Sequence, residues 1–166
     1  MVFENLSISD ENGIREMSDM ATEIVREHFD PIIGKAQNDY MIARFQTADA
    51  IRDQLKNGYE YYFVSFDDQR IGFLAFYPKK KWNTMYLSKF YLYKSERGKG
   101  YSRQMLDFVI ARTRENKLSF IELNVNRNNS AILAYEKLGF EAIRSEKNDI
   151  GSGFFMDDYV YCLKVS

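Results

Sequence analysis

The feature that most limits how this chain can fold is a strand-like segment followed by a helical segment and a second strand-like segment. Residues 85–93 and 120–125 are rich in aromatic and aliphatic side chains and suit strands, whereas residues 102–116 repeat apolar side chains at helical spacing. A strand, a helix and a strand in this order form a crossover that places the two strands parallel in one sheet. We therefore expect a parallel pair near the centre of the sheet and a ligand site where the crossover helix begins.

The other strand-like and helical segments follow from the same periodicities. Residues 61–66 and 71–77 are joined by Asp67, Asp68 and Gln69 and predict a hairpin. Apolar side chains from Ile14 to Val25 predict a helix that ends at Asp30 and Pro31. The remaining predicted elements are a first strand at 3–8, helices at 36–45, from Thr47 to Gly58 and at 129–138, and a closing hairpin of residues 140–145 and 154–165.

Nothing in the sequence divides this pattern into separate domains. There are only two prolines and no linker rich in serine and glycine, so residues 1–166 are predicted to form one domain. The mixture of elements predicts an α/β (α+β) fold with a central, mixed, mostly antiparallel, twisted sheet flanked by helices.

Composition excludes several classes of function. The formal net charge is −1 and no basic stripe is present, which argues against a nucleic-acid partner. One cysteine and one histidine leave no internal disulfide and no metal site rich in these residues. No apolar run approaches the roughly 20 residues that span a bilayer, and the N-terminus has no signal-peptide pattern. We expect a cytoplasmic protein without a membrane partner.

A glycine-rich loop connects the first strand of the crossover to its helix. Two glycines allow the backbone to come close to a phosphate, and the start of the helix presents free N–H groups and a positive dipole. Three basic side chains add charge suited to a phosphorylated ligand. The loop is neither a Walker loop nor a Rossmann fingerprint. Its residues are Arg97, Gly98, Lys99, Gly100, Tyr101, Ser102 and Arg103.

A second motif follows the next strand and carries a family resemblance. Ala131, Tyr135, Gly139 and Phe140 match the pattern Asn-x-x-Ala-x-x-x-Tyr-x-x-x-Gly-Phe of the GNAT superfamily of N-acetyltransferases, and Asn128 and Asn129 are both candidates for its asparagine. The loop resembles the Gln/Arg-x-x-Gly-x-Gly/Ala motif of the same superfamily, with serine at its last position. Together the two motifs predict a single-domain GNAT fold.

The resemblance implies a site for acetyl-CoA as co-substrate, without a metal. The diphosphate would bind the backbone of residues 97–103, and the pantetheine arm would run along the strand that ends at Tyr93. Backbone N–H groups near Leu92 would polarise the thioester carbonyl. Asn128 and Asn129 complete the residues expected to bind CoA.

Catalysis is expected to depend on Tyr135 and Glu122. The resemblance implies that Tyr135 protonates the departing CoA thiolate. A general base must also remove a proton from the acceptor amine. Strand 85–93 carries no carboxylate, whereas Glu122 shares one face of strand 120–125 with Asn124. Glu122 is therefore the candidate base, with water relayed by backbone carbonyls as the alternative.

These expectations lead to an N-acetyltransferase that moves acetyl from acetyl-CoA to a primary amine by direct attack. A polyamine or other small amine is the favoured acceptor class, because the closing hairpin combines aromatic side chains with Asp157 and Asp158, either of which suits a cation. A protein or peptide N-acetyltransferase and a catalytically silent CoA-binding module are the alternatives. A homodimer is left open.

Overall fold

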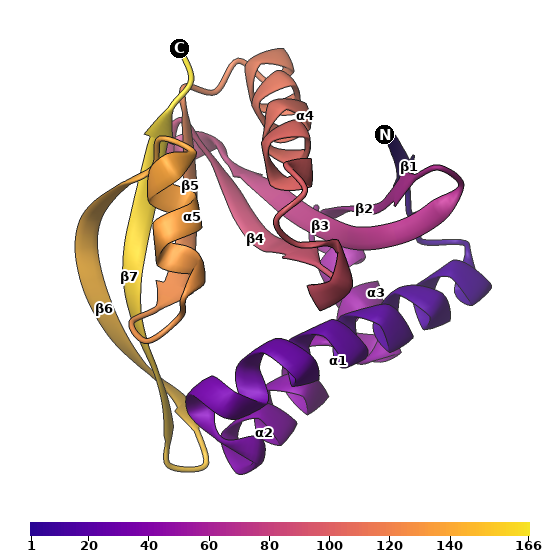
Figure 1. The fold of residues 1–166 in the computed structure, drawn as a ribbon, viewed down its shortest axis with the longest axis vertical. Helices are drawn as coiled ribbons and strands as arrows, with labels where there is room; N and C mark the ends of the chain where they lie inside the picture. The colour runs from indigo at the N-terminus through magenta and orange to yellow at the C-terminus, as the bar shows by residue number, and fades with distance from the viewer. The chain divides into compact units, whose positions relative to one another are not determined.

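Seven strands form a mixed sheet in the hydrogen-bonding order β1-β2-β3-β4-β5-β7-β6 in the computed structural model, which describes residues 1–166 (Figure 1). The strands are β1 (Val2–Asn5), β2 (Glu60–Phe66), β3 (Gln69–Lys79), β4 (Thr84–Leu92), β5 (Phe120–Asn126), β6 (Glu141–Gly151) and β7 (Phe154–Lys164). The helices are α1 (Glu11–Ile33), α2 (Lys35–Phe45), α3 (Ala48–Lys56), α4 (Tyr101–Glu115) and α5 (Ala131–Lys137). The predicted α/β fold is confirmed, including the strand–helix–strand crossover of β4, α4 and β5.

The contacts within this fold divide the chain into two compact units. The first contains residues 1–77 and 89–105, and the second contains residues 78–88 and 106–166. The chain passes from one unit to the other inside β4 and again inside α4. Each unit therefore contains part of the crossover.

The first unit is built on an antiparallel arrangement of β1, β2 and β3. The turn between β2 and β3 contains Asp67 and Asp68, with φ of 50° and 63°. Two successive positive φ values match the twist of a tight hairpin, which aspartate tolerates. Side chains of α1 pack on this hairpin in an apolar core that contains Ile14, Met17 and Phe73, each fully buried. The hairpin predicted from residues 61–66 and 71–77 is thus confirmed.

Local sequence signals predict one end of the N-terminal helices correctly and another wrongly. The Thr47 side chain accepts a hydrogen bond from the Ala50 N–H at 3.1 Å, so the predicted cap of α3 is confirmed. The predicted end of α1 at Asp30 and Pro31 is wrong, because the helix continues to Ile33. Proline lacks only one donor, and the helix ends instead at Gly34, whose φ is 84°. The first strand is also shorter than the predicted 3–8.

A buried lysine joins the connection between α2 and α3 to the second half of β4. Lys89 is 5% exposed. Its ammonium donates to the Phe45 carbonyl and the Gln46 side chain, each at 2.9 Å, and to the Tyr61 hydroxyl. No carboxylate neutralises it, and burial lowers the pKa of Lys89 to about 7. This lysine holds a helix connection in place at the cost of burying its charge.

Lys89 is expected to make stability depend on pH above neutrality. Its pKa falls from 10.5 in the unfolded chain to about 7 in the folded one, so between these values the unfolded chain binds more protons and stability rises with pH. The contribution is at most about 1.4 kcal/mol per pH unit. Urea unfolding at pH 7 and 9.5 should show this rise in the wild type and a smaller one in Lys89→Met. Equal rises in the two proteins would contradict the assignment.

The second unit consists of the first half of β4, most of α4, and the strands β5, β7 and β6 with α5. β4 and β5 are parallel, with Thr84 opposite Phe120 and Tyr86 opposite Glu122. β7 pairs antiparallel with both β5 and β6. Strand β6 extends well beyond the predicted 140–145, because its polar residues continue the ladder with β7 while facing solvent.

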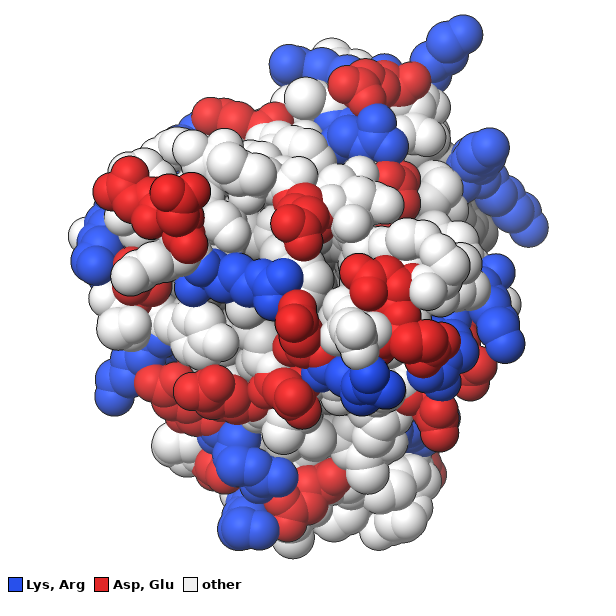
Figure 2. All heavy atoms as spheres, turned by 90° about the vertical axis from the view of Figure 1, so that its right-hand side faces the viewer, with Lys and Arg blue, Asp and Glu red and all other residues white.

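Positively and negatively charged side chains lie side by side on one face of the protein. The face shown in Figure 2 carries Lys and Arg beside Asp and Glu without a continuous basic area. None of the helices has the length and apolar character that crossing a bilayer requires.

Candidate functional site

The loop from Arg97 to Gly100 has a backbone that only glycine adopts easily at two positions. Gly98 has φ of 78° and Gly100 has φ of 81°, both in the left-handed region. A Cβ built on either glycine meets no atom within 4 Å, so open space lies on that side of the loop. Backbone conformation, and not crowding, is thus the reason for glycine at these two positions.

The same loop presents a row of unused backbone donors. The N–H groups of Gly98, Lys99 and Gly100 donate no hydrogen bond within the chain. Tyr101 and Ser102 begin α4, and the first N–H groups of a helix have no hydrogen-bond partner within the helix, because the chain one turn earlier is not helical. Five consecutive donors at the positive end of a helix dipole form an anion site of the kind that binds phosphate groups. The predicted diphosphate loop fits this arrangement.

Two basic side chains of the loop, unlike its backbone N–H groups, already have partners within the chain. Lys99 pairs with Glu96 at 3.1 Å, and Arg97 donates to the Leu92 carbonyl at 3.4 Å. Both lie at the surface, where such contacts contribute little to stability and exchange readily with other partners. The backbone is therefore the better-defined part of the loop.

The end of β4, which leads into this loop, is held close to β3 by Gly72. A Cβ at Gly72 would lie 2.1 Å from the Tyr91 carbonyl oxygen and 3.0 Å from the Leu92 Cα. The Tyr93 N–H donates to the Ile71 carbonyl at 3.0 Å. The N–H of Tyr93, a residue that we expect to contact CoA, is therefore already used in a hydrogen bond within the chain. Of the two predicted residues at this end, only Leu92 could offer its N–H to a thioester.

The second motif lies in the second unit, where hydrogen bonds between asparagine side chains and backbone N–H groups form the turn that precedes α5. The Asn129 side chain accepts from the Ala131 N–H at 2.9 Å and is 7% exposed, so it closes a turn of the Asx type just before α5. The Asn128 N–H donates to the Asn126 side chain at 2.9 Å, and Asn128 is exposed. Asn129 thus holds the turn that leads into α5, and Asn128 belongs to the turn before it, while a role of either residue in CoA binding stays a prediction.

Tyr135 is held by the motif residues that follow it. Its ring contacts Phe140 edge to face, with 5.9 Å between the ring centroids. The Phe140 N–H donates to the Tyr135 carbonyl at 3.1 Å, and Gly139 makes this turn possible with φ of 102°. The Tyr135 side chain is half-buried. The spacing of tyrosine, glycine and phenylalanine is therefore explained by the end of one short helix.

Glu122 occupies the polar face of β5, as predicted, but it is engaged by a neighbour. Its Oε1 accepts from Arg144 Nη2 at 3.2 Å, and Arg144 also binds Glu146 at 2.8 Å. Taking up a proton would break the ion pair with Arg144. The pairing joins residues on β5 and β6 that are 22 positions apart, and the sequence offered no signal for it.

A partly buried row of three hydrogen-bonded polar side chains lies on the same sheet face, and the sequence does not identify it as a unit. The Tyr86 hydroxyl donates to Asn124 Oδ1 at 2.8 Å, and Asn124 Nδ2 donates to Asp158 Oδ2 at 3.3 Å. Asp158 is 3% exposed. Alternation along β5 could have indicated Asn124, whereas the partners from β4 and β7 come only from strand pairing. No group of three or more His, Cys, Asp or Glu side chains lies close enough together to hold a metal ion.

A family model matches most of the chain. Residues 23–156 match the model described as an acetyltransferase (GNAT) domain, and this range includes both motifs, Glu122 and Tyr135 but ends before Asp158. No curated protein sequence matches the chain.

Solved structures with the same fold are numerous and distant in sequence. The PaiA N-acetyltransferase from Thermoplasma acidophilum, in complex with coenzyme A, is 20% identical over 99% of both chains, with a TM-score of 0.73. GCN5 from Tetrahymena is 14% identical over 100% of this chain and 97% of its own, with a TM-score of 0.65. A spermidine N-acetyltransferase chimera from Vibrio cholerae is 14% identical over 99% and 96%, with a TM-score of 0.68. At these identities the structures establish the shared fold, and the match to the domain model establishes the family: the chain belongs to the GNAT acetyltransferases.

Proposed function

We propose that this protein transfers the acetyl group of acetyl-CoA to a primary amine by direct attack of the amine on the thioester. The observation that carries the proposal is the loop at residues 97–103, where the N–H groups of five consecutive residues, 98 to 102, are unused and two of these residues are glycines with positive φ. This arrangement suits the diphosphate of CoA. Family membership supports the acetyl group as the transferred unit.

The roles of the side chains follow from the chemistry of the transfer. The N–H of Leu92 would stabilise the oxyanion that forms as the amine attacks. Tyr135 would give its phenolic proton to the CoA sulfur as the carbon–sulfur bond breaks. Glu122 stays a predicted base, although its ion pair with Arg144 competes with that role.

A polyamine or another small amine is the acceptor class that we favour. Two structures of the same fold are described as a spermidine N-acetyltransferase and an aminoglycoside 6′-acetyltransferase, which act on amines of this kind. The polar face of β5, β7 and β6, with Glu122, Asn124 and Asp158, offers carboxylate and amide groups to such a cation. The cytoplasmic location expected from the sequence stays a prediction.

An acceptor screen tests this function directly. The protein is incubated with acetyl-CoA and single amines, which include spermidine, an aminoglycoside and short peptides, and free thiol is measured over time. Thiol release that depends on a small amine is the expected result. Release only with peptides would favour a peptide N-acetyltransferase. CoA binding without release in any mixture would indicate a silent binding module.

A further inference from the structure

Asp158 is a buried carboxylate whose hydrogen bonds are incomplete. It is 3% exposed, and Asn124 provides the only hydrogen bond to its side chain, at 3.3 Å. A carboxylate can accept several hydrogen bonds and normally requires a cationic partner or several donors when it is removed from water. Asp158 makes no ion pair within the chain. Within the chain, this carboxylate therefore accepts a hydrogen bond from Asn124 alone.

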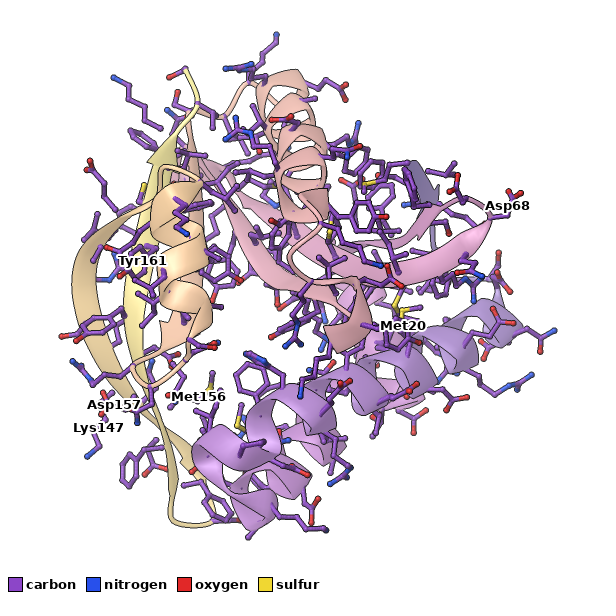
Figure 3. All side chains as sticks on the ribbon, viewed as in Figure 1. Met20, Asp68, Lys147, Met156, Asp157 and Tyr161 are labelled. Atoms are coloured by element: carbon purple, nitrogen blue, oxygen red, sulfur yellow. The ribbon has the colours of Figure 1, made fainter.

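The neighbouring aspartate shows that the missing partner is specific to position 158. Asp157 Oδ1 pairs with Arg127 at 3.2 Å, and its side chain is 46% exposed. In Figure 3, Asp157 and its neighbour Met156 lie on opposite sides of the β6–β7 hairpin. Side chains alternate along a strand, so Asp158 shares the side of Met156. Opposite Asp158 in the sheet is Glu146, which is bound by Arg144.

The charges around Asp158 favour a positively charged ligand. Burial raises the pKa of Asp158, and the negative charges of Asp157 and Glu146 act in the same direction, while Asn124 and Arg127 oppose them. Each nearby arginine is already bound to another carboxylate, because Arg127 holds Asp157 and Arg144 holds Glu146 and Glu122. A cation that reached Asp158 would replace a costly isolated charge by an ion pair.

We propose that Asp158 binds the ammonium group of the acceptor and takes its proton, which makes the amine able to attack. This inference rests on the proposed acetyl transfer. The amine nitrogen forms a bond to the acetyl carbon, and the bond from that carbon to sulfur breaks. The nitrogen loses two protons in all. One leaves to solvent through Asp158. The other leaves as the carbon–sulfur bond breaks, and Tyr135, having given its proton to the sulfur, regains one from solvent, so that one proton is released in all.

The Tyr86–Asn124 pair positions this carboxylate. Tyr86 donates to Asn124 Oδ1, which orients the amide so that its Nδ2 faces Asp158. An amide that donates one hydrogen bond leaves the second carboxylate oxygen, Oδ1, for the ammonium. Glu122 lies on the same face but is satisfied by Arg144, so Asp158 is the carboxylate with free capacity.

Three proteins test the proposal: the wild type, Asp158→Asn, and Asp157→Asn as the matched neighbour on the other side of the hairpin. Thiol release from acetyl-CoA is measured with spermidine, n-butylamine and alanine amide between pH 6 and 9.5. Asp158→Asn should lower kcat/KM at pH 7 by about 100-fold, and its remaining rate should rise with pH because only free amine reacts. Asp157→Asn should stay within about twofold of the wild type, since surface ion pairs contribute little.

Thermal unfolding provides a second readout that does not need turnover. A raised pKa in the folded state means that the wild type loses stability as pH rises from the ordinary value of 3.8 through the folded value. The Tm of Asp158→Asn should therefore exceed that of the wild type increasingly between pH 4 and 7. The same three amines should raise the Tm of the wild type and of Asp157→Asn, but not that of Asp158→Asn.

The outcomes distinguish failure of the role of Asp158 from failure of the proposed acetyl transfer. Turnover by Asp158→Asn within threefold of the wild type, or an equal loss in Asp157→Asn, overturns the role of Asp158 and leaves acetyl transfer standing. Amines that stabilise the wild type through Asp158 without thiol release overturn acetyl transfer and support the cation site. An absence of both turnover and stabilisation overturns both.

Discussion

Replacement of Tyr135 by phenylalanine is expected to lower kcat about 100-fold while the affinity for CoA stays unchanged. A general acid typically contributes a factor of about 100 or more, and phenylalanine removes only the hydroxyl that would protonate the sulfur. The ring should keep its edge-to-face contact with Phe140, so the fold of α5 should be retained. Stopped assays of thiol release at saturating acetyl-CoA measure kcat, and calorimetry with CoA measures binding.

A second tyrosine on the same unit provides the control. Tyr159 on β7 contacts Tyr161 edge to face and lies 4.4 Å from the Arg127 guanidinium, on the side of β7 opposite to Asp158. Tyr159→Phe should retain nearly full activity. Wild-type turnover by Tyr135→Phe would show that the thiolate leaves without this acid.

Replacement of Gly100 by valine is expected to weaken CoA binding about 100-fold or more. A side chain at φ of 81° is strained by about 1–2 kcal/mol, and more for a β-branched residue. The loop should relieve this strain by rotating, which turns N–H groups away from the diphosphate. Loss of two charge-assisted hydrogen bonds at about 1.5 kcal/mol each corresponds to a factor of about 100.

The matched control is Gly58→Val at the end of α3. Gly58 has φ of 93° and, like Gly100, open space around its Cβ position, so it experiences the same kind of strain. Both variants should lose similar stability, whereas only Gly100→Val should lose CoA. Calorimetry with CoA and with pantetheine, which lacks the diphosphate, refines the test. The preference of the wild type for CoA should disappear in Gly100→Val; a preserved preference would place the diphosphate elsewhere.

Much of the fold could be predicted because its signals are local. The β2–β3 turn requires two residues that tolerate positive φ, and Asp67 and Asp68 provide them. The crossover of β4, α4 and β5 follows from a change of apolar period, and the cap at Thr47 follows from one side chain beside a helix start. The two glycines of the loop are likewise a local signal, because each indicates a backbone with positive φ at its own position.

Other features could not be predicted because they depend on which distant segments pack together. The chain alone could not show that Lys89 is buried, since its partners lie 28 to 44 residues away. Glu122 faced the expected side, but its arginine comes from β6. Pro31 is a strong local signal, and the helix nevertheless continued past it.

The sequence by itself determined the family, the order of the elements and the glycine-rich loop predicted to bind phosphate, because each depends on neighbouring residues or fixed spacings. The two aspartates of β7 show what it could not determine. In the sequence, Asp157 and Asp158 are adjacent and indistinguishable, and either could be paired with a cation. The tertiary structure gave Asp157 an arginine at the surface and left Asp158 buried with one hydrogen bond. Burial of a charge is decided by every segment that excludes water from it, and no local pattern contains that information.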